Sequence, residues 1–353
     1  MSLDRLGWDE RFAEAFASLG DPALLPGRVA VEHRSEYVLL VPAGEVRARL
    51  AGRLRHDAST LSELPAVGDW VAFRSTHEIG VIHAVLPRRS RFSRRMAGDQ
   101  TGEQVVAANI DVVFLLTALG SDFNVRRLER YLTLAWESGA EPVIVLTKSD
   151  LILDASSSVA DAEAVGFGVP VIVASSVTGA GVKEVRARVP AGRTGALLGS
   201  SGVGKSTLLN RLLGREHLRT AETREDGRGR HTTTHRELVP LPDGGLIIDT
   251  PGMRELQLWS DGSGLGDAFA DISGLAAECR FDDCLHVAEP DCAVKAAVER
   301  GALDAQRLES FHKLQRELAR LERLGDPLAA AERKRQDKSM MRLGRSHIRN
   351  KYR

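Results

Sequence analysis

One short segment of this 353-residue chain has an unmistakable chemical pattern: Gly199-Ser-Ser-Gly-Val-Gly-Lys-Ser206 matches the phosphate-loop sequence GxxxxGK[ST]. Its glycines allow successive backbone N–H groups to curl around phosphate oxygens, and the dipole of a following helix favours their negative charge. An apolar strand pattern precedes the segment and an amphipathic stretch follows it, which makes a merely structural glycine-rich turn the weaker alternative. We expect Lys205 to reach the outer phosphates and Ser206 to hold magnesium. The predicted phosphate-binding residues are Gly199, Ser200, Ser201, Gly202, Val203, Gly204, Lys205, Ser206 and Thr207.

A second pattern predicts which base is bound. Thr147-Lys148-Ser149-Asp150 ends the apolar run PVIVL. A carboxylate there can accept hydrogen bonds from N1–H and the 2-amino group of guanine, and adenine has no such pair of donors. The usual motif begins with Asn, so Thr147 is a departure that can loosen the support of this loop. The run VPVIV is followed by Ala174, Ser175 and Ser176, whose backbone N–H groups can turn towards the guanine carbonyl oxygen.

A third pattern concerns the metal and the γ-phosphate. The run GLIID ends in Asp249-Thr-Pro-Gly252, a DxxG element in which the Asp holds the metal through water and the Gly N–H senses the γ-phosphate. Before it lies a polar, glycine-flanked segment, Gly229–His235, which we interpret as a switch loop. One of its three threonines, Thr232, Thr233 or Thr234, should complete the magnesium shell, and we favour Thr233. The alternative is an ordinary polar loop.

The sequence lacks a residue that often assists hydrolysis. In Ras-like enzymes a Gln after DxxG orients the attacking water, but Met253 stands there in this chain. His231 and His235 flank the threonines, and a histidine can hydrogen-bond a water beside the γ-phosphate. We predict that His231 positions the water, with His235 and solvent-exposed loop histidines as the alternatives.

All three cysteines fall within fourteen residues, in the pattern Cys279-x4-Cys284-x-His286-x5-Cys292. Three thiolates and one imidazole can close a tetrahedral zinc site with no open position for water, so the metal should be structural. Free, buried cysteines are the alternative.

The chain has 353 residues and a domain averages about 150, so we expect more than one domain to position these residues. A composition of 43% hydrophobic and 27% charged residues argues against a disordered chain and against a membrane protein. The polar, acidic start is unlike a secretory signal, so we expect a cytoplasmic protein.

Short alternating segments between Val29 and about Leu86 predict a small β-barrel. Its aromatic residues could stack on nucleic acid or belong to the core, and we favour the core. From Ile110 onward, buried apolar runs alternate with helical patterns, which is typical of βα units on a parallel sheet. An amphipathic helix is predicted over Leu303–Leu324. The barrel aromatics in question are Tyr37, Trp70, Phe73 and Phe92.

Charge is unevenly distributed in a chain whose formal net charge is zero. Residues 333–353 contain nine Lys or Arg and one acid, and Leu86–Met96 contains five Arg. Such segments favour a polyanionic partner, although a solvated tail that only aids solubility is the alternative.

The base-reading segments at 147–150 and 174–176 precede the phosphate loop at 199, whereas ordinary GTPases have the opposite order. The chain is therefore predicted to be circularly permuted, with Val189–Thr194 linking the old termini. The new cut falls after Gly252, so the nucleotide-sensing segment runs directly into the C-terminal domain.

These features together resemble the RsgA family of circularly permuted, ribosome small-subunit-dependent GTPases over about residues 28–320. The resemblance includes VGDWV (67–71), LPRRS (86–90), AANIDVVF (107–114) and the Cys/His cluster followed by EPDCAVKAAVE. It implies an OB-type β-barrel, an α/β circularly permuted P-loop GTPase domain and a small helical zinc-binding domain. It also implies rRNA binding during late maturation of the small ribosomal subunit, with GTP hydrolysis stimulated by that subunit.

We accordingly expect an N-terminal extension at 1–27, the barrel at 28–95, the GTPase domain at 100–258, the zinc-binding domain at 259–330 and a basic tail at 331–353. The expected cofactors are one structural zinc and magnesium with GTP. The expected state is a monomer without a membrane partner. The main alternative is an RNA-assembly scaffold that binds GTP with little turnover. An ATP-dependent kinase or helicase is disfavoured by Asp150 and by the lack of a further catalytic base motif.

Overall fold

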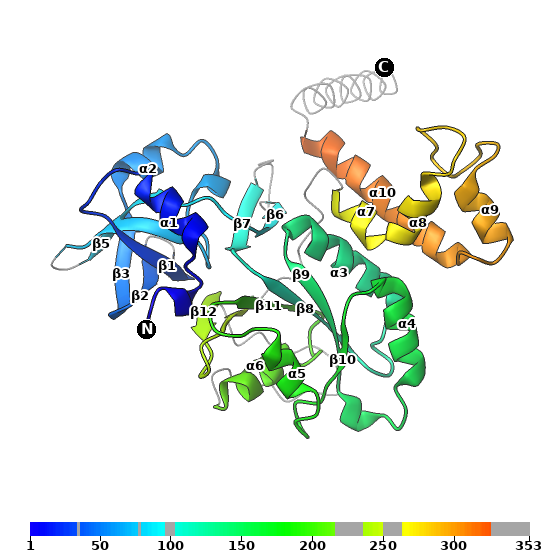
Figure 1. Cartoon of the computed structure of the whole chain (residues 1–353), viewed down its shortest axis with the longest axis horizontal. Coiled ribbons are helices and arrows are strands. Elements are labelled where there is room, and N and C mark those ends of the chain that lie inside the picture. The colour runs from blue at the N-terminus through cyan, green and yellow to red at the C-terminus, as the bar shows by residue number, and fades with distance from the viewer. Residues whose placement is uncertain (34–35, 77–78, 96–102, 216–235, 250–262, 326–353) are drawn as a thin grey trace, which may run out of the picture.

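The computed structural model describes residues 1–33, 36–76, 79–95, 103–215, 236–249 and 263–325. Figure 1 shows a barrel, a central sheet covered by helices, and a helical C-terminal unit, in that order along the chain. The predicted multidomain fold class is confirmed. No helix within the described residues has the length and apolar character needed to cross a membrane.

Five strands close the barrel: β1 (Leu25–Glu32), β2 (Tyr37–Val41), β3 (Gly44–Leu50), β4 (Trp70–Arg74) and β5 (Gly80–Val85). Their order is β1-β2-β3-β5-β4, and β1 also pairs with β4, so the sheet has no free edge at that point. Only β3 and β5 are parallel. The α2 helix (Gly52–Asp57) lies in the connection between β3 and β4.

The barrel strands run from Leu25 to Val85, close to the segment from Val29 to about Leu86 in which the alternating pattern predicted them. The start of β1 is closely packed, since a Cβ at Gly27 would lie 3.1 Å from the Phe73 ring. At the other end, β6 (Arg91–Arg95) pairs with β7 (Glu103–Ala108) in a separate antiparallel hairpin.

The barrel aromatics are core residues. Trp70 is fully buried and the other three are at most 5% exposed, so the stacking alternative is wrong for all four. Trp70 also contacts Trp8 edge-on, with ring centroids 4.7 Å apart. The buried side chains of Tyr37 and Phe73 pack with Val29, Leu39 and Ile82 inside the barrel.

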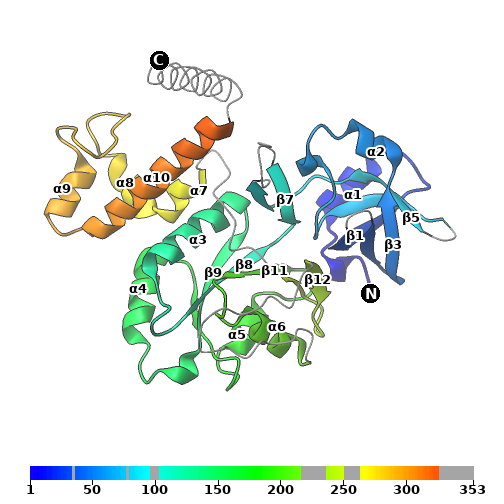
Figure 2. The ribbon, with the colours of Figure 1, turned by 180° about the vertical axis from the view of Figure 1, so that it is seen from behind.

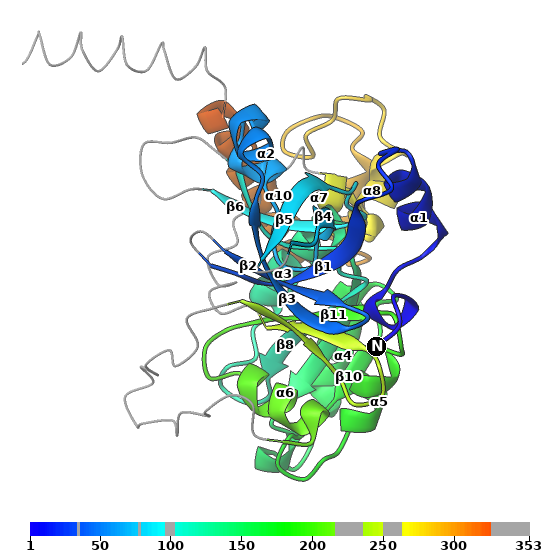
Figure 3. The same ribbon diagram turned by 90° about the vertical axis from the view of Figure 1, so that its left-hand side faces the viewer.

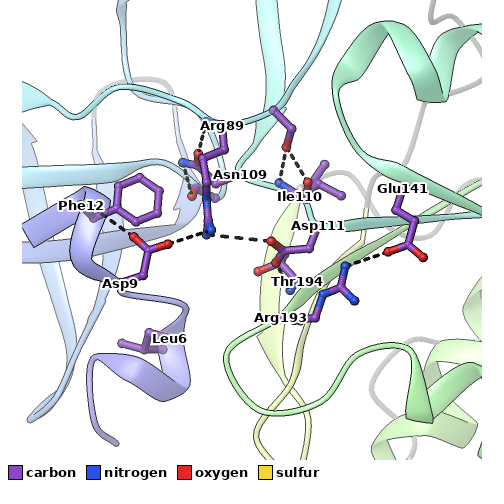
Figure 4. Close-up of polar contacts among 12 residues, drawn as sticks. Leu6, Asp9, Phe12, Arg89, Asn109, Ile110, Asp111, Glu141, Arg193 and Thr194 are labelled. Atoms are coloured by element: carbon purple, nitrogen blue, oxygen red, sulfur yellow. Dashed lines mark hydrogen bonds and ion pairs between the residues drawn. The ribbon is translucent and has the colours of Figure 1, made fainter. Parts of the chain in front are cut away.

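The N-terminal segment is part of the packed structure. The α1 helix (Glu10–Ala17) begins at Asp9, whose side chain accepts a hydrogen bond from the Phe12 backbone N–H at 3.1 Å. Figure 4 shows Arg89 between Asp9, at 2.9 Å, and Asp111 of the central domain, at 3.9 Å. Asp111 also accepts a hydrogen bond from the Thr194 N–H at 2.7 Å. The segment therefore lies at the junction of barrel and central sheet.

The central sheet has the strand order β10-β9-β8-β11-β13-β12. Its first five strands are parallel, as their apolar runs predicted, and β12 is antiparallel. Helices α3 and α4 cover one face, and α5 and α6 cover the other (Figure 1). The elements are β8 (Val112–Ala118), α3 (Val125–Ser138), β9 (Glu141–Thr147), α4 (Ser156–Gly166), β10 (Val171–Val173), α5 (Val182–Ala187), β11 (Thr194–Gly199), α6 (Lys205–Leu213), β12 (Glu237–Pro240) and β13 (Leu246–Asp249).

The barrel and the central sheet are joined at one edge. Strand β12 pairs with β1 through Val31 and Glu237, and Figure 3 shows β1 to β3 lying against the edge of the central sheet. This pairing extends the ladder across both domains. The strand that follows the predicted switch segment therefore contacts the barrel directly.

Within the described residues, the C-terminal unit consists of four helices: α7 (Ser263–Ala268), α8 (Ala270–Ala276), α9 (Ala293–Glu299) and α10 (Ala305–Gly325). The predicted amphipathic helix over 303–324 is confirmed as α10. Figure 2 shows α7 and α10 lying beside α3. Gly264 permits this approach, because a Cβ there would lie 2.5 Å from the Glu137 backbone nitrogen.

Ion pairs tie α10 to α3. Arg130 makes two bonds to Glu317, at 2.7 and 2.6 Å. Arg307 is buried and binds Glu129 at 3.0 Å and Asp271 of α8 at 2.6 Å. The C-terminal unit is thus held to the central domain by charge-assisted contacts as well as by apolar packing.

Candidate nucleotide site and metal centre

The phosphate loop connects β11 to α6. Its glycines adopt conformations that other residues rarely do, with φ of 71° at Gly202 and 105° at Gly204. Gly199 lies so close to β8 that a Cβ would be 2.7 Å from the Leu116 carbonyl oxygen. Lys205 begins α6, and its Nζ donates to the carbonyl oxygens of Gly199 and Ser200, both at 2.7 Å. The ammonium group is therefore held over the loop that the sequence predicted to bind phosphate.

Thr147 joins the predicted base-reading loop to the phosphate loop. It is buried at the end of β9, and its hydroxyl donates to the Val203 carbonyl oxygen at 2.7 Å. These residues are 56 positions apart in the chain. Although Thr replaces the usual Asn, a direct bond supports the loop at this position.

Asp150 and Ser175 come from different loops and meet. The Ser175 hydroxyl donates to Asp150 Oδ1 at 2.5 Å, and Ser175 Oγ in turn accepts the backbone N–H groups of Val177 and Thr178, both at 3.2 Å. Lys148 adopts a left-handed conformation, φ 60°, which turns the chain at this point. The Ser149 N–H bonds the Ala174 carbonyl oxygen at 3.2 Å. Ser175 therefore orients one carboxylate oxygen of Asp150.

These loops meet because parallel strands present their carboxyl ends at one edge of a sheet. Strands β9, β10 and β11 carry the segments at 147, 174 and 199, and Asp249 ends β13 at the same edge. Asp249 is 6% exposed. The remaining predicted residues, His231, Thr232, Thr233, Thr234, His235, Gly252 and Met253, lie outside the described residues.

Sequence reasoning missed Asp122. It follows β8, the strand between β9 and β11, and its Oδ2 accepts the Ser200 hydroxyl at 3.0 Å. The same carboxylate oxygen lies 3.0 Å from Arg127 on α3. The available signal was its position just beyond a buried parallel strand, where ligand-binding residues gather.

The predicted metal group is assembled. The ligand atoms of Cys279, Cys284, His286 and Cys292 all lie within 4.8 Å of one another. Cys279 Sγ is 3.8 Å from Cys292 Sγ and 3.6 Å from His286 Nδ1, and Cys292 Sγ is 3.4 Å from that nitrogen. Around a tetrahedral zinc, metal–ligand distances of about 2.3 Å for sulfur and about 2.0 Å for nitrogen place the ligands about 3.5–3.8 Å apart. This donor set could hold a metal ion.

The order of these elements defines a class of protein: a P-loop GTPase domain, circularly permuted, between a five-stranded barrel and a helical unit with a Cys3His group. The chain belongs to the RsgA GTPase family. The family model described as RsgA GTPase matches residues 85–259. This membership identifies the chain as an enzyme that hydrolyses GTP.

Similar proteins cover nearly all of the chain. The protein named Small ribosomal subunit biogenesis GTPase RsgA from Opitutus terrae is 51% identical over 348 residues, which are 95% of each chain. Its namesake from Syntrophotalea carbinolica is 45% identical and is covered to 97%. The crystal structure of YjeQ from Thermotoga maritima matches 84% of this chain and 99% of its own at 28% identity, with a TM-score of 0.65. That of YloQ, a circularly permuted GTPase, matches 84% of this chain and 96% of its own at 25% identity, with a TM-score of 0.62.

Proposed function

We propose that this chain uses GTP hydrolysis as a switch in late maturation of the small ribosomal subunit, binds that subunit's rRNA, and hydrolyses GTP faster on the subunit. The observation that supports the nucleotide switch is the bond between Thr147 and Val203, which joins the proposed base-reading loop to the phosphate loop. The names of the relatives supply the link to the small subunit. We further propose a monomer acting in the cytoplasm, without a membrane partner.

Guanine selectivity is assigned to Asp150. Losing a charge-assisted, two-point contact in a partly desolvated site costs about 2–4 kcal/mol, so Asp150→Ala should weaken GTP binding by about two decades. Nucleotide titration checks this, with Asp161→Ala, an exposed carboxylate on α4, as the control. Equal GTP affinity in wild type and Asp150→Ala would contradict the assignment. The other residues proposed around the base are Thr147, Lys148, Ser149, Ser175 and Ser176.

Magnesium would be held by Ser206 and, through water, by Asp249, with Thr233 completing the shell. The ion would supply charge to the β- and γ-phosphates. Lys205 would neutralise the same phosphates, and Gly252 would bond the γ-phosphate through its N–H. The described part of this set has the right chemistry, since Ser206 lies in the first turn of α6, directly after the phosphate loop, and Asp249 ends the neighbouring strand.

His231 is proposed to position the attacking water, because Met253 has no group suited to that task. Intrinsic turnover should be slow, and the subunit should raise it by favouring the competent loop conformation. His231→Ala should lose the stimulated rate while GTP-analogue binding and subunit binding persist. Turnover measured with and without small subunits decides this. Unchanged stimulation would exclude His231 and point to His235 or to a group from the ribosome.

The arginines of Leu86–Met96 divide into two groups. Arg88 binds Asp69 at 2.7 Å and Arg89 binds Asp9, so these two stabilise the protein. The Arg91 side chain is 56% exposed, and its Nε lies 3.5 Å from a carboxylate oxygen of Glu103. Because Arg88 and Arg89 already pair with carboxylates, we assign the main RNA contacts of this cluster to its exposed cations, together with the basic tail.

The metal of the Cys3His group is proposed to be a structural zinc, one per chain. A closed shell of three thiolates and an imidazole leaves no site for catalysis, and it holds together a loop that has little core of its own. Metal analysis of protein purified without chelators should find one zinc. Its absence would contradict the proposal.

One comparison separates the switch from an RNA-assembly scaffold. GTP turnover is measured with and without small subunits, alongside competition between GTP and ATP for the purified protein. A switch shows GTP preference and a turnover rate that rises with subunits. Binding of subunits without such a rise would favour the scaffold.

A further inference from the structure

The loop that carries the metal group exposes large apolar side chains. We call residues 278–292 the knuckle; it connects α8 to α9 at the end of the molecule away from the barrel (Figure 1). Phe281 is 41% exposed, Leu285 57% and Val287 64%. These three lie within seven residues of chain. Apolar side chains gathered on the surface of a soluble protein are a common mark of a binding face.

The knuckle is held in shape beneath these side chains. The Glu289 carboxylate accepts the backbone N–H groups of Leu285 at 3.1 Å, Val287 at 2.9 Å and Ala288 at 3.0 Å. His312 of α10 is 3.1 Å from the Leu285 carbonyl oxygen. Hydrogen bonds with the Glu289 and His312 side chains therefore hold the backbone of the loop, while its apolar side chains are exposed. An anchor that is already ordered loses little conformational entropy on binding.

The charge of the knuckle selects the partner. Its sequence has five carboxylates against one cation, Arg280, which pairs with Asp291 at 2.8 Å. Three thiolates around a divalent metal would add further negative charge. This surface repels RNA phosphate and attracts a basic partner. The neighbouring α10 differs, with Lys313, Arg316 and Arg320 exposed.

We propose that the knuckle docks on a basic, apolar-bearing protein segment of the small ribosomal subunit, and that it makes no contact with the rRNA. The partner class rests on the proposed function, while the choice of protein over RNA rests on the apolar side chains and the acidic charge. Leu285 and Val287 serve as anchors, and Asp282 and Asp283 complement the partner's cations.

The test compares binding to intact small subunits with binding to protein-free rRNA from the same subunits. One variant combines Leu285→Ser with Val287→Ser, and a second combines Asp282→Lys with Asp283→Lys. The control is Phe167→Ser, which removes a 60%-exposed apolar side chain at the end of α4. Metal content and the unfolding midpoint are measured for each variant, and a photo-cross-linker at position 287 reports the partner directly.

Both double variants should bind intact subunits about tenfold or more weakly and bind protein-free rRNA as wild type does, and the cross-link should join protein to protein. Tighter subunit binding by the lysine variant, or equal losses on protein-free rRNA, would show an RNA-facing surface and overturn the proposal. So would unchanged subunit binding, or an equal loss in Phe167→Ser. If wild type itself fails to bind subunits, the proposed function fails and this partner with it.

Discussion

At the scale of single residues, Thr147 couples the two halves of the nucleotide site. Its hydroxyl bonds the Val203 carbonyl oxygen inside the phosphate loop, and it also lies 3.4 Å from the Thr117 carbonyl oxygen. Asp122 contacts the same loop through the Ser200 hydroxyl. The phosphate loop is thus supported by side chains from the ends of two neighbouring strands, β8 and β9.

Replacing Thr147 with Val tests this support. The change keeps the shape of the side chain and leaves the Val203 carbonyl oxygen without its donor, which costs about 1–2 kcal/mol. If this cost weakens the nucleotide-binding form of the loop, GTP and GDP affinity should each drop about five- to thirtyfold. Thr147→Ser keeps the hydroxyl and should restore most of the affinity. Titration of both nucleotides measures the effect, and equal losses in the Val and Ser variants would show that packing, not the hydrogen bond, matters.

At the scale of elements, α3 connects the nucleotide site to the C-terminal unit. It begins at Asn124, whose side chain accepts the Arg127 N–H at 2.9 Å, and Arg127 contacts Asp122 beside the phosphate loop. On the same helix, Arg126 pairs with Glu309 and Arg130 with Glu317 of α10. Burial raises the pKa of Glu129, and hydrogen bonds from Ser310 and Arg307 oppose that rise. Because burying this carboxylate is costly, its ion pair with Arg307 is important for stability.

Two substitutions on this interface should differ sharply. Arg307→Met leaves Glu129 and Asp271 without their buried cation and should destabilise the C-terminal unit by about 3–5 kcal/mol. Arg126→Ala removes a pair whose side chains are 49% and 64% exposed, and should cost less than about 1 kcal/mol. Denaturant unfolding of the whole chain measures both. Similar losses for the two variants would mean that burial does not govern these pairs.

At the scale of the whole molecule, a neutral chain concentrates cations at its C-terminus. The tail 333–353 has a net charge of +8 by residue count, so the rest of the chain carries the balancing negative charge. Part of that negative charge lies on the knuckle. A molecule arranged in this way can present cations to RNA with one surface and carboxylates to protein with another.

Deleting residues 333–353 should make subunit binding less dependent on salt. Each lost phosphate contact lowers the slope of log K against log salt concentration by about 0.7–0.9, because fewer counterions are released. Affinity is measured between about 50 and 200 mM salt for the full chain and the truncated chain. GTP turnover without subunits serves as the control and should not change. An unaltered slope would show that the tail is only solvated.

Features that are contiguous in the chain could be predicted from the sequence. The phosphate loop, the Cys3His set and the helix at 303–324 each lie within about twenty residues, so spacing alone brings their side chains together. The parallel strands were also predictable, because strands buried on both faces read as unbroken apolar runs. The order of the motifs along the chain was enough to predict the circular permutation.

Contacts between segments that are distant in the chain could not be predicted from the sequence. Period-two alternation does not show which face of a strand is buried, so the sequence left the burial of Trp70 and Phe73 undecided. In the closed barrel both side chains are buried. The bond between Thr147 and Val203, and that between Asp122 and Ser200, depend on β8 lying between β9 and β11. Strand order is a property of the whole sheet, because each strand's place depends on packing that no single segment encodes.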